Sequence, residues 1–160
     1  MTEIGRILDQ HARAFDGDPW YGFPLMKLLS GVTAKTAAAR PIPRAHTIWE
    51  IVLHIAAWES AALERLQSGF VALPEEGDWP ECAASDEDAW QRTLNHLKHT
   101  HGRLHEILSR LHSDRLDDML GAERDLTTGG GYSVGGTLHG IIQHNVYHSG
   151  QIAILRKALE

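Results

Sequence analysis

Two histidines near the C-terminal end of the chain have the spacing of a helical metal site. His144 and His148 are four residues apart, so on a helix they lie next to each other on one face. Ile141 and Ile152 place that face on the apolar side of the predicted helix. Buried imidazoles need partners for their nitrogens. One divalent ion would satisfy both rings, and so would hydrogen bonds to neighbours or water, so the spacing alone leaves both interpretations open.

A third ligand would have to come from another helix. His54 borders an apolar stripe, next to Ile51 and Trp58, where its side chain could line a cleft that opens to solvent. A lone histidine in such a position more often hydrogen-bonds to a neighbour than binds a metal. Position alone therefore supports His54 less than the pair on the last helix.

A rival pair lies earlier in the chain. His101 and His105 also have i,i+4 spacing, with His101 at the border of a leucine stripe and His105 further toward solvent. We predict that both are mostly solvated, with metal binding as the less favoured alternative. His11 falls on the stripe of the first helix and is predicted to pack in the core rather than bind a metal.

Hydrophobic periodicity predicts the helices that would position these side chains. The best-defined start is at Thr47, because Thr47 and Glu50 have the capping-box pattern. Gly69 is a plausible end for the same helix. The predicted helices cover roughly residues 2–15, 24–30, 47–69, 85–111 and 134–159, the second being short.

The segments between these helices carry turn signals. We predict a turn in TAKTAAAR (33–40) and a flexible loop in the glycine-rich TTGGGYSVGG (127–136), and we find no convincing strand. The connection 70–84 is long enough to cross from one end of a bundle to the other. The prediction is therefore an all-α protein, one domain over residues 1–160, built as a four-helix bundle with a long crossover between helices 2 and 3.

Composition narrows the classes of function. A formal net charge of −6 argues against nucleic-acid binding. The sequence contains no run of 18 apolar residues, so we predict no membrane span. The N-terminal segment lacks the basic and apolar regions of a secretory signal. Cys82 is the only cysteine, which fits a reducing cytoplasm and leaves nitrogen and oxygen as the ligands for any metal.

Three stretches resemble a known family. HTIWEIVLHIAAWE (46–59) and HNVYHSGQI (144–152) together resemble the DinB-like, or YfiT-like, superfamily of metal-dependent bundle proteins, and PWYGFPLMKLLSGVTAKTAAARPIPRAH (19–46) resembles it as well. The resemblance implies a four-helix bundle with a three-histidine metal site. It places the ligands at His54, His144 and His148, and it implies nickel or zinc and a homodimer.

An open three-histidine site is the arrangement of a catalytic rather than a structural metal. We therefore expect a metal-dependent enzyme acting on a small-molecule substrate, as a thiol-dependent S-transferase or a hydrolase, with a low-molecular-weight thiol as co-substrate in the first case. The alternatives are a non-enzymatic, stress-related protein that binds metal or a small ligand, and a purely structural role in which the histidines only pack.

Other residues near the predicted site have candidate roles. Glu50 could orient His54 or accept a proton, although capping already explains it. Trp58 and Gln151 are candidates for contact with the substrate, and Tyr147 for a dimer contact. Cys82 has no neighbouring histidine motif, so we do not propose it as a nucleophile.

Overall fold

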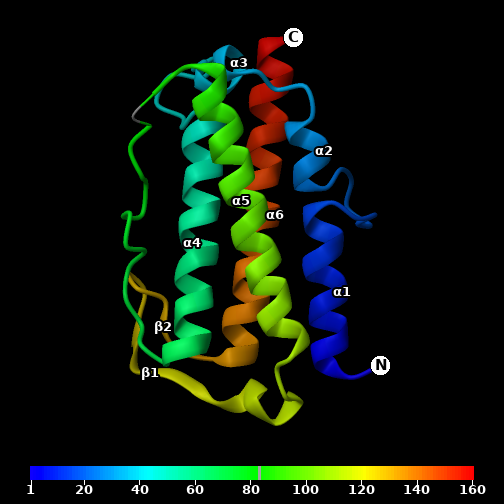
Figure 1. Cartoon of the computed structure of the whole chain (residues 1–160), viewed down its shortest axis with the longest axis vertical. Helices are drawn as coiled ribbons and strands as arrows, with labels where there is room; N and C mark the ends of the chain where they lie inside the picture. The colour runs from blue at the N-terminus through cyan, green and yellow to red at the C-terminus, as the bar shows by residue number, and fades with distance from the viewer. Residues whose placement is uncertain (83) are drawn as a thin grey trace.

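Most of the chain is helical. The computed structural model describes residues 1–82 and 84–160, and its four long helices lie side by side (Figure 1). The elements in chain order are α1 (Glu3–Phe15), α2 (Leu25–Leu29), α3 (Ala34–Ala38), α4 (Ile48–Ser68), α5 (Glu87–Ser109), the 3₁₀ helix η1 (Ser113–Asp117), β1 (Met119–Asp125), β2 (Gly130–Ser133) and α6 (Val134–Leu159). No helix in this described part is both long and apolar enough to cross a membrane.

Helix α4 begins and ends where its sequence predicts. The Thr47 hydroxyl accepts from the backbone N–H of Glu50 at 3.2 Å, and the Glu50 carboxylate accepts from the backbone N–H of Thr47 at 2.8 Å. This reciprocal capping box satisfies two backbone donors that the first turn leaves free. Gly69 ends the helix with φ 72°, a left-handed conformation that favours glycine.

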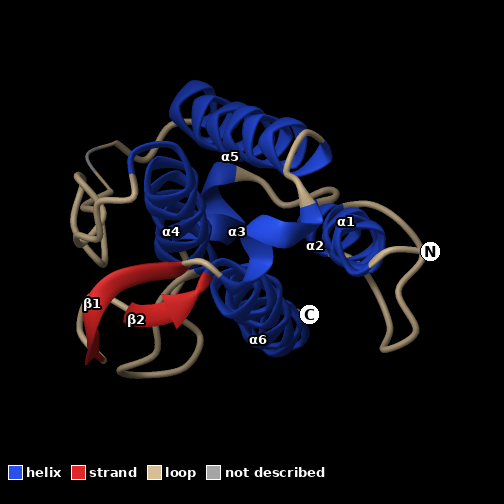
Figure 2. Ribbon diagram, turned by 90° about the horizontal axis from the view of Figure 1, so that it is seen from below, coloured by secondary structure: helices blue, strands red, loops and turns tan. Residues whose placement is uncertain are grey.

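The long helices pack around a shared interior. Helix α4 packs against α5 and α6, and α1 packs against α5 and α6 from the other side (Figure 2). Trp90 on α5 is fully buried and donates from its indole N–H to the carbonyl of Val32 at 2.7 Å. The connection after α4 runs along the outside of that helix before α5 begins (Figure 1).

The prediction of no strand was wrong, and two predicted segments differ from the structure. The predicted turn 33–40 contains α3, whose first turn is capped by the hydroxyl of Thr33. The predicted loop 127–136 contains β2, which pairs antiparallel with β1 beside α4 and α6 (Figure 2). Gly131 has φ 74°, and a Cβ there would lie 2.6 Å from the backbone of Glu123. The glycines of this segment thus allow a close approach of two strands rather than a flexible loop.

Candidate metal-binding site

The structure brings His54, His144 and His148 together between α4 and α6. One ring nitrogen of each histidine lies within 4.8 Å of the others. The Nε2 atoms of His54 and His144 are 2.9 Å apart, and the rings of His54 and His144 each meet the His148 ring nearly edge-on. Three imidazoles from two helices therefore converge on one point, as the periodicity of each helix predicts for His144 and His148 and as the family resemblance implies for His54.

Hydrogen bonds on the far side of two rings decide which nitrogen carries the proton. His54 Nδ1 lies 2.5 Å from the backbone carbonyl oxygen of Asp78, and because a carbonyl only accepts, Nδ1 donates. His148 Nδ1 lies 2.6 Å from Oε1 of Gln151 and donates in the same way. A neutral imidazole has a single N–H. Nε2 of both rings therefore keeps its lone pair, which is how metal-binding histidines are commonly oriented.

Two residues of this site lie in the connection between α4 and α5 and were not predicted. Besides its carbonyl bond to His54, Asp78 accepts from the indole N–H of Trp58 at 2.8 Å. The Trp79 ring stacks on the His54 ring at 3.9 Å, 8° from parallel. The only sequence signal for them is a tryptophan between two prolines in a stretch that is otherwise polar, PEEGDWPE (74–81).

Burial keeps the three imidazoles neutral. Burial, followed by the neighbouring His148 and His54, lowers the pKa of His144 from 6.5 to about 3. Burial also lowers the pKa of His54 and of His148 below the ordinary value, partly opposed by Asp78 and Gln151 respectively. Neutral imidazole is the form that binds a cation, so at neutral pH the rings need lose no proton to act as ligands.

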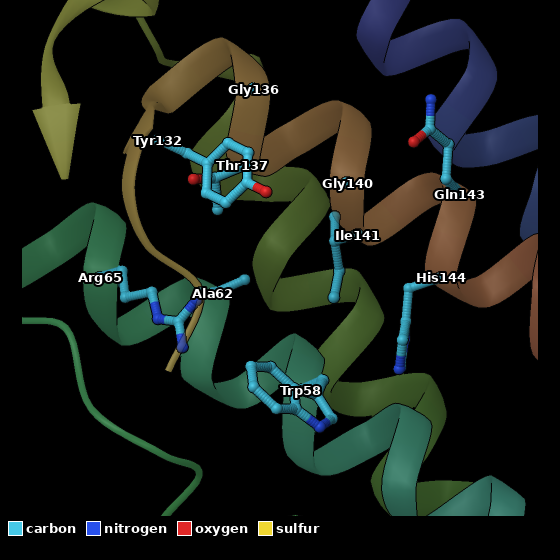
Figure 3. Close-up of a pocket in the computed structure, with 11 residues that line it drawn as sticks. Trp58, Ala62, Arg65, Tyr132, Gly136, Thr137, Gly140, Ile141, Gln143 and His144 are labelled. Carbon is cyan, nitrogen blue, oxygen red and sulfur yellow. The ribbon is translucent and has the colours of Figure 1, made fainter. Parts of the chain in front are cut away.

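A pocket adjoins the three-histidine site through His144, which is part of its lining. It has a volume of about 350 Å³. Figure 3 shows His144 at one end, Arg65 at the other and the Trp58 ring between them. Its remaining walls are mainly apolar side chains, glycines and hydroxyl groups, from Ala62, Gly129, Tyr132, Gly136, Thr137, Gly140, Ile141 and Gln143.

The other predicted site residues have definite places. Trp58 lines the pocket with its ring 6.2 Å from that of His144. Gln151 contacts His148 rather than the pocket lining. Glu50 pairs with Arg40 at 2.7 Å in addition to its capping bond, and within residues 1–82 and 84–160 it makes no hydrogen bond to His54.

A second group of histidines lies in the interior. His101 Nδ1 and Asn145 Nδ2 lie 3.0 and 2.6 Å from the same carboxylate oxygen of Glu59, and the His11 ring stacks on the His101 ring at 3.9 Å. Glu59 is 0% exposed. We call His11, Glu59, His101 and Asn145 the core cluster. Ligand atoms of its two histidines and Glu59 also lie within 4.8 Å of one another.

The core cluster corrects one prediction and confirms another. His101 is only 7% exposed, so the prediction that it is mostly solvated was wrong, whereas His11 packs in the core as predicted, at 1% exposed. His105 is half-buried and its Nδ1 lies 3.3 Å from Nδ1 of His11. The rival pair therefore does not form a site of its own: His101 joins Glu59, and His105 joins His11.

Comparisons with known proteins agree with this architecture. The model of the DinB superfamily matches residues 25–152. A crystal structure described as that of the conserved protein of locus from Enterococcus faecalis has a TM-score of 0.71 at 18% identity, with 99% of this chain and 97% of that chain covered. An identity that low shows a shared fold alone. The search of curated proteins gave no match.

Proposed function

The chain belongs to the DinB superfamily, and on that premise we propose that it is a divalent-metal-dependent enzyme whose ligands are His54, His144 and His148. The observation that carries the proposal is the pair of outer hydrogen bonds to Asp78 and Gln151, which leave Nε2 of His54 and His148 unprotonated. Three neutral imidazole ligands are suited to zinc or nickel. The proposal takes the four long helices as a bundle of the DinB type, with the connection after α4 as its crossover.

The residues present fit such an ion. Three neutral imidazoles supply three ligands and leave further positions for a substrate. His144 Nδ1 is buried without a hydrogen-bond partner in the described part of the chain, and its Nε2 faces Nε2 of His54 at 2.9 Å. When bound, the ion supplies Lewis-acid chemistry, which serves thiol transfer and ester or amide hydrolysis alike.

The chain's own residues orient the ligands and shape the substrate space. Asp78 fixes the His54 ring through its carbonyl and holds Trp58 through its carboxylate. Trp58 and Ile141 then form an apolar wall beside His144, which excludes water from one side of the site. We place thiol-dependent transfer to a small molecule ahead of hydrolysis. Its co-substrate would be a low-molecular-weight thiol.

Elemental analysis of the untagged full chain tests the metal. We expect about one zinc or nickel per chain after dialysis, and near zero in His144→Ala. His139→Ala is the matched control, because His139 lies on the same helix, is exposed and pairs with Glu3 at 3.3 Å. A wild-type chain that stays empty and shows no change in Tm on adding either metal would overturn the proposal.

Non-enzymatic metal binding is the second candidate. One observation favours it: Asp78 is the carboxylate paired with these rings in the described residues, and its Oδ1 already accepts from Trp58. Asp78 lies at Nδ1 of His54, away from Nε2, and in the described residues no other carboxylate pairs with the three rings. A chain with stoichiometric metal but without turnover on a panel of thiols with electrophilic acceptors, and on an ester panel, would support this candidate instead.

A homodimer remains part of the proposal. Tyr147 and Ile154 are seven residues apart on α6, so they share a face, and they are 66% and 59% exposed. Exposed apolar side chains on one face are typical of contact surfaces. Light scattering of the wild type and of Tyr147→Glu would measure the mass; a monomeric wild type contradicts the dimer and leaves the metal site unaffected.

A further inference from the structure

Arg65 is a buried cation at the far end of the pocket from His144. Its side chain projects from the last turn of α4 and the residue is only 5% exposed. Nη2 donates to the backbone carbonyls of Ala72, at 2.9 Å, and Thr128. The guanidinium is therefore held in place by the two segments that flank the end of α4.

Within residues 1–82 and 84–160, the charge of Arg65 has no partner of opposite sign. In the part of the chain that the structure describes, no carboxylate lies within 4.0 Å of it, and its buried Nε–H has no acceptor. A buried charge without a counter-charge destabilises the fold. Two carbonyls and the C-terminal end of α4 offset a part of this, and in the described residues Nη1 remains without a hydrogen bond at the pocket wall.

The pocket leaves space for a ligand between this donor and His144. The Arg65 guanidinium carbon lies 5.3 Å from the centre of the Trp58 ring, and the centre of the His144 ring lies 6.2 Å from the Trp58 ring. The wall between these two ends is apolar, formed by Trp58, Ala62 and Ile141 (Figure 3). A compact molecule with one negatively charged end and an apolar middle would match the cation at Arg65 and the apolar wall beside it.

We propose that the pocket binds small organic anions, with a carboxylate at Arg65 and an apolar body against Trp58. The proposal rests on the proposed function in one respect, that the free end of the ligand meets the metal site at His144. The negative end of the ligand supplies an acceptor for Nη1, which makes no hydrogen bond in the described residues, and a counter-charge for the guanidinium. Neutral analogues of the same shape leave the cation unpaired and bind more weakly.

Calorimetric titration with phenylacetate and with its neutral isostere phenylacetamide tests the preference. We expect the wild-type full chain to bind phenylacetate about tenfold more tightly, as one charge-assisted hydrogen bond predicts. Arg65→Gln should bind both equally. Arg124→Gln is the matched control, because Arg124 is exposed and lies over the Tyr132 ring at 4.0 Å; it should keep the preference.

Running each titration with and without zinc separates the two proposals. If Arg65 binds the carboxylate, the preference persists in metal-free protein; if the carboxylate binds only the ion, the preference disappears with the ion and the inference is wrong. Conversely, a chain that binds no metal but still prefers phenylacetate contradicts the proposed enzyme and supports the anion pocket. Equal affinities for both compounds in the wild type would overturn the inference outright.

A second variant protects the test against unfolding of Arg65→Gln. Gly140 lines the pocket, and a Cβ added there meets nothing within 4 Å, so Gly140→Leu fills the pocket without straining α6. It should weaken phenylacetate binding about tenfold while Arg65 stays in place. Full-strength binding in Gly140→Leu would show that the anion lies elsewhere and would contradict the pocket assignment.

Discussion

Two histidine clusters lie in the helical interior, one between α4 and α6 and the other between α1, α4, α5 and α6, and they differ in how the rings face one another. At the three-histidine site, His148 meets His54 and His144 nearly edge-on, at 76° and 75°. In the core cluster, His11 and His101 are parallel to within 3°. An imidazole lone pair lies in the plane of its ring, so two stacked rings cannot both direct a lone pair at one ion. The first arrangement suits a cation and the second does not.

The clusters also differ in what surrounds them. The three-histidine site adjoins a pocket at His144, and its paired carboxylate, that of Asp78, is half-exposed and lies at Nδ1 of His54. The core cluster encloses Glu59 completely, with His101 and Asn145 on one oxygen and no partner for the other in residues 1–82 and 84–160. One cluster is therefore arranged to receive a ligand, and the other to satisfy a charge that helix packing has buried.

The largest expected effect separates the clusters by metal content. His148→Ala removes a proposed ligand and should lower the metal content from about one per chain to near zero. His101→Ala, a substitution of the same kind in the core cluster, should leave it unchanged. Elemental analysis of both variants measures this, and loss of metal from His101→Ala would show that the core cluster holds the ion.

The next effect is on stability. Glu59→Ala leaves His101 and Asn145 without their shared acceptor, and we expect a loss of about 3 kcal/mol in the free energy of unfolding. Glu59→Gln is the matched control, because the amide keeps the shape and one acceptor oxygen and should cost less. Urea denaturation of the metal-free proteins measures both. A neutral Glu59→Ala would mean that the carboxylate contributes nothing to the fold.

A third effect depends on pH. Burial, followed by His101 and His105, lowers the pKa of His11 from 6.5 to about 2. Below pH 6.5 the unfolded chain takes up a proton that the folded chain does not. Stability contributed by His11 is therefore present above pH 6.5 and decreases by about 1.4 kcal/mol per pH unit as the pH falls toward 2.

The variant His11→Gln isolates that contribution. We expect the slope of the free energy of unfolding against pH to decrease by the contribution of one proton in this variant. The slope is measured on metal-free protein between about pH 6.5 and pH 4. The remaining slope belongs to the other histidines, those of the three-histidine site included. An unchanged slope would show that His11 takes up a proton in the folded chain.

The smallest effect concerns the outer edge of the core cluster. His105→Ala removes the contact with His11 Nδ1, but His105 is half-buried, so water can replace it. We expect a loss below about 1 kcal/mol and no change in metal content. A loss as large as that of Glu59→Ala would mean that the cluster extends to His105 as one unit.

Local signals in the sequence were enough to predict the long helices. Thr47 and Gly69 mark the two ends of α4 by capping alone, and α6 covers the predicted residues 134–159. The short helix α3 also has its signal, because Thr33 caps a run rich in alanine, although the two prolines beyond it favoured a turn. The hairpin has none, since four of its residues are glycines without alternating apolar positions.

The clusters depended on contacts that one helix cannot reveal. His101 lies at the edge of the α5 stripe, and it is buried because Phe15 and His11 of α1 stack on its two sides. Asp78 and Trp79 reach His54 from a connection whose path no periodicity describes. Joining His54 to the pair on α6 likewise needed the family resemblance, because a helix face predicts direction and not the neighbour it meets.

The connection that carries Asp78 and Trp79 belongs to no helix, although it orients the His54 ring and holds Trp58. The helices position the backbone of the proposed ligands. This segment orients the His54 ring and holds Trp58, which forms one wall of the pocket. In evolutionary terms the segment can diverge separately from the helices, provided that Val71 and Trp79, which pack against the core, stay apolar. For an engineer, it is the first stretch of the chain to randomise when a new substrate is wanted.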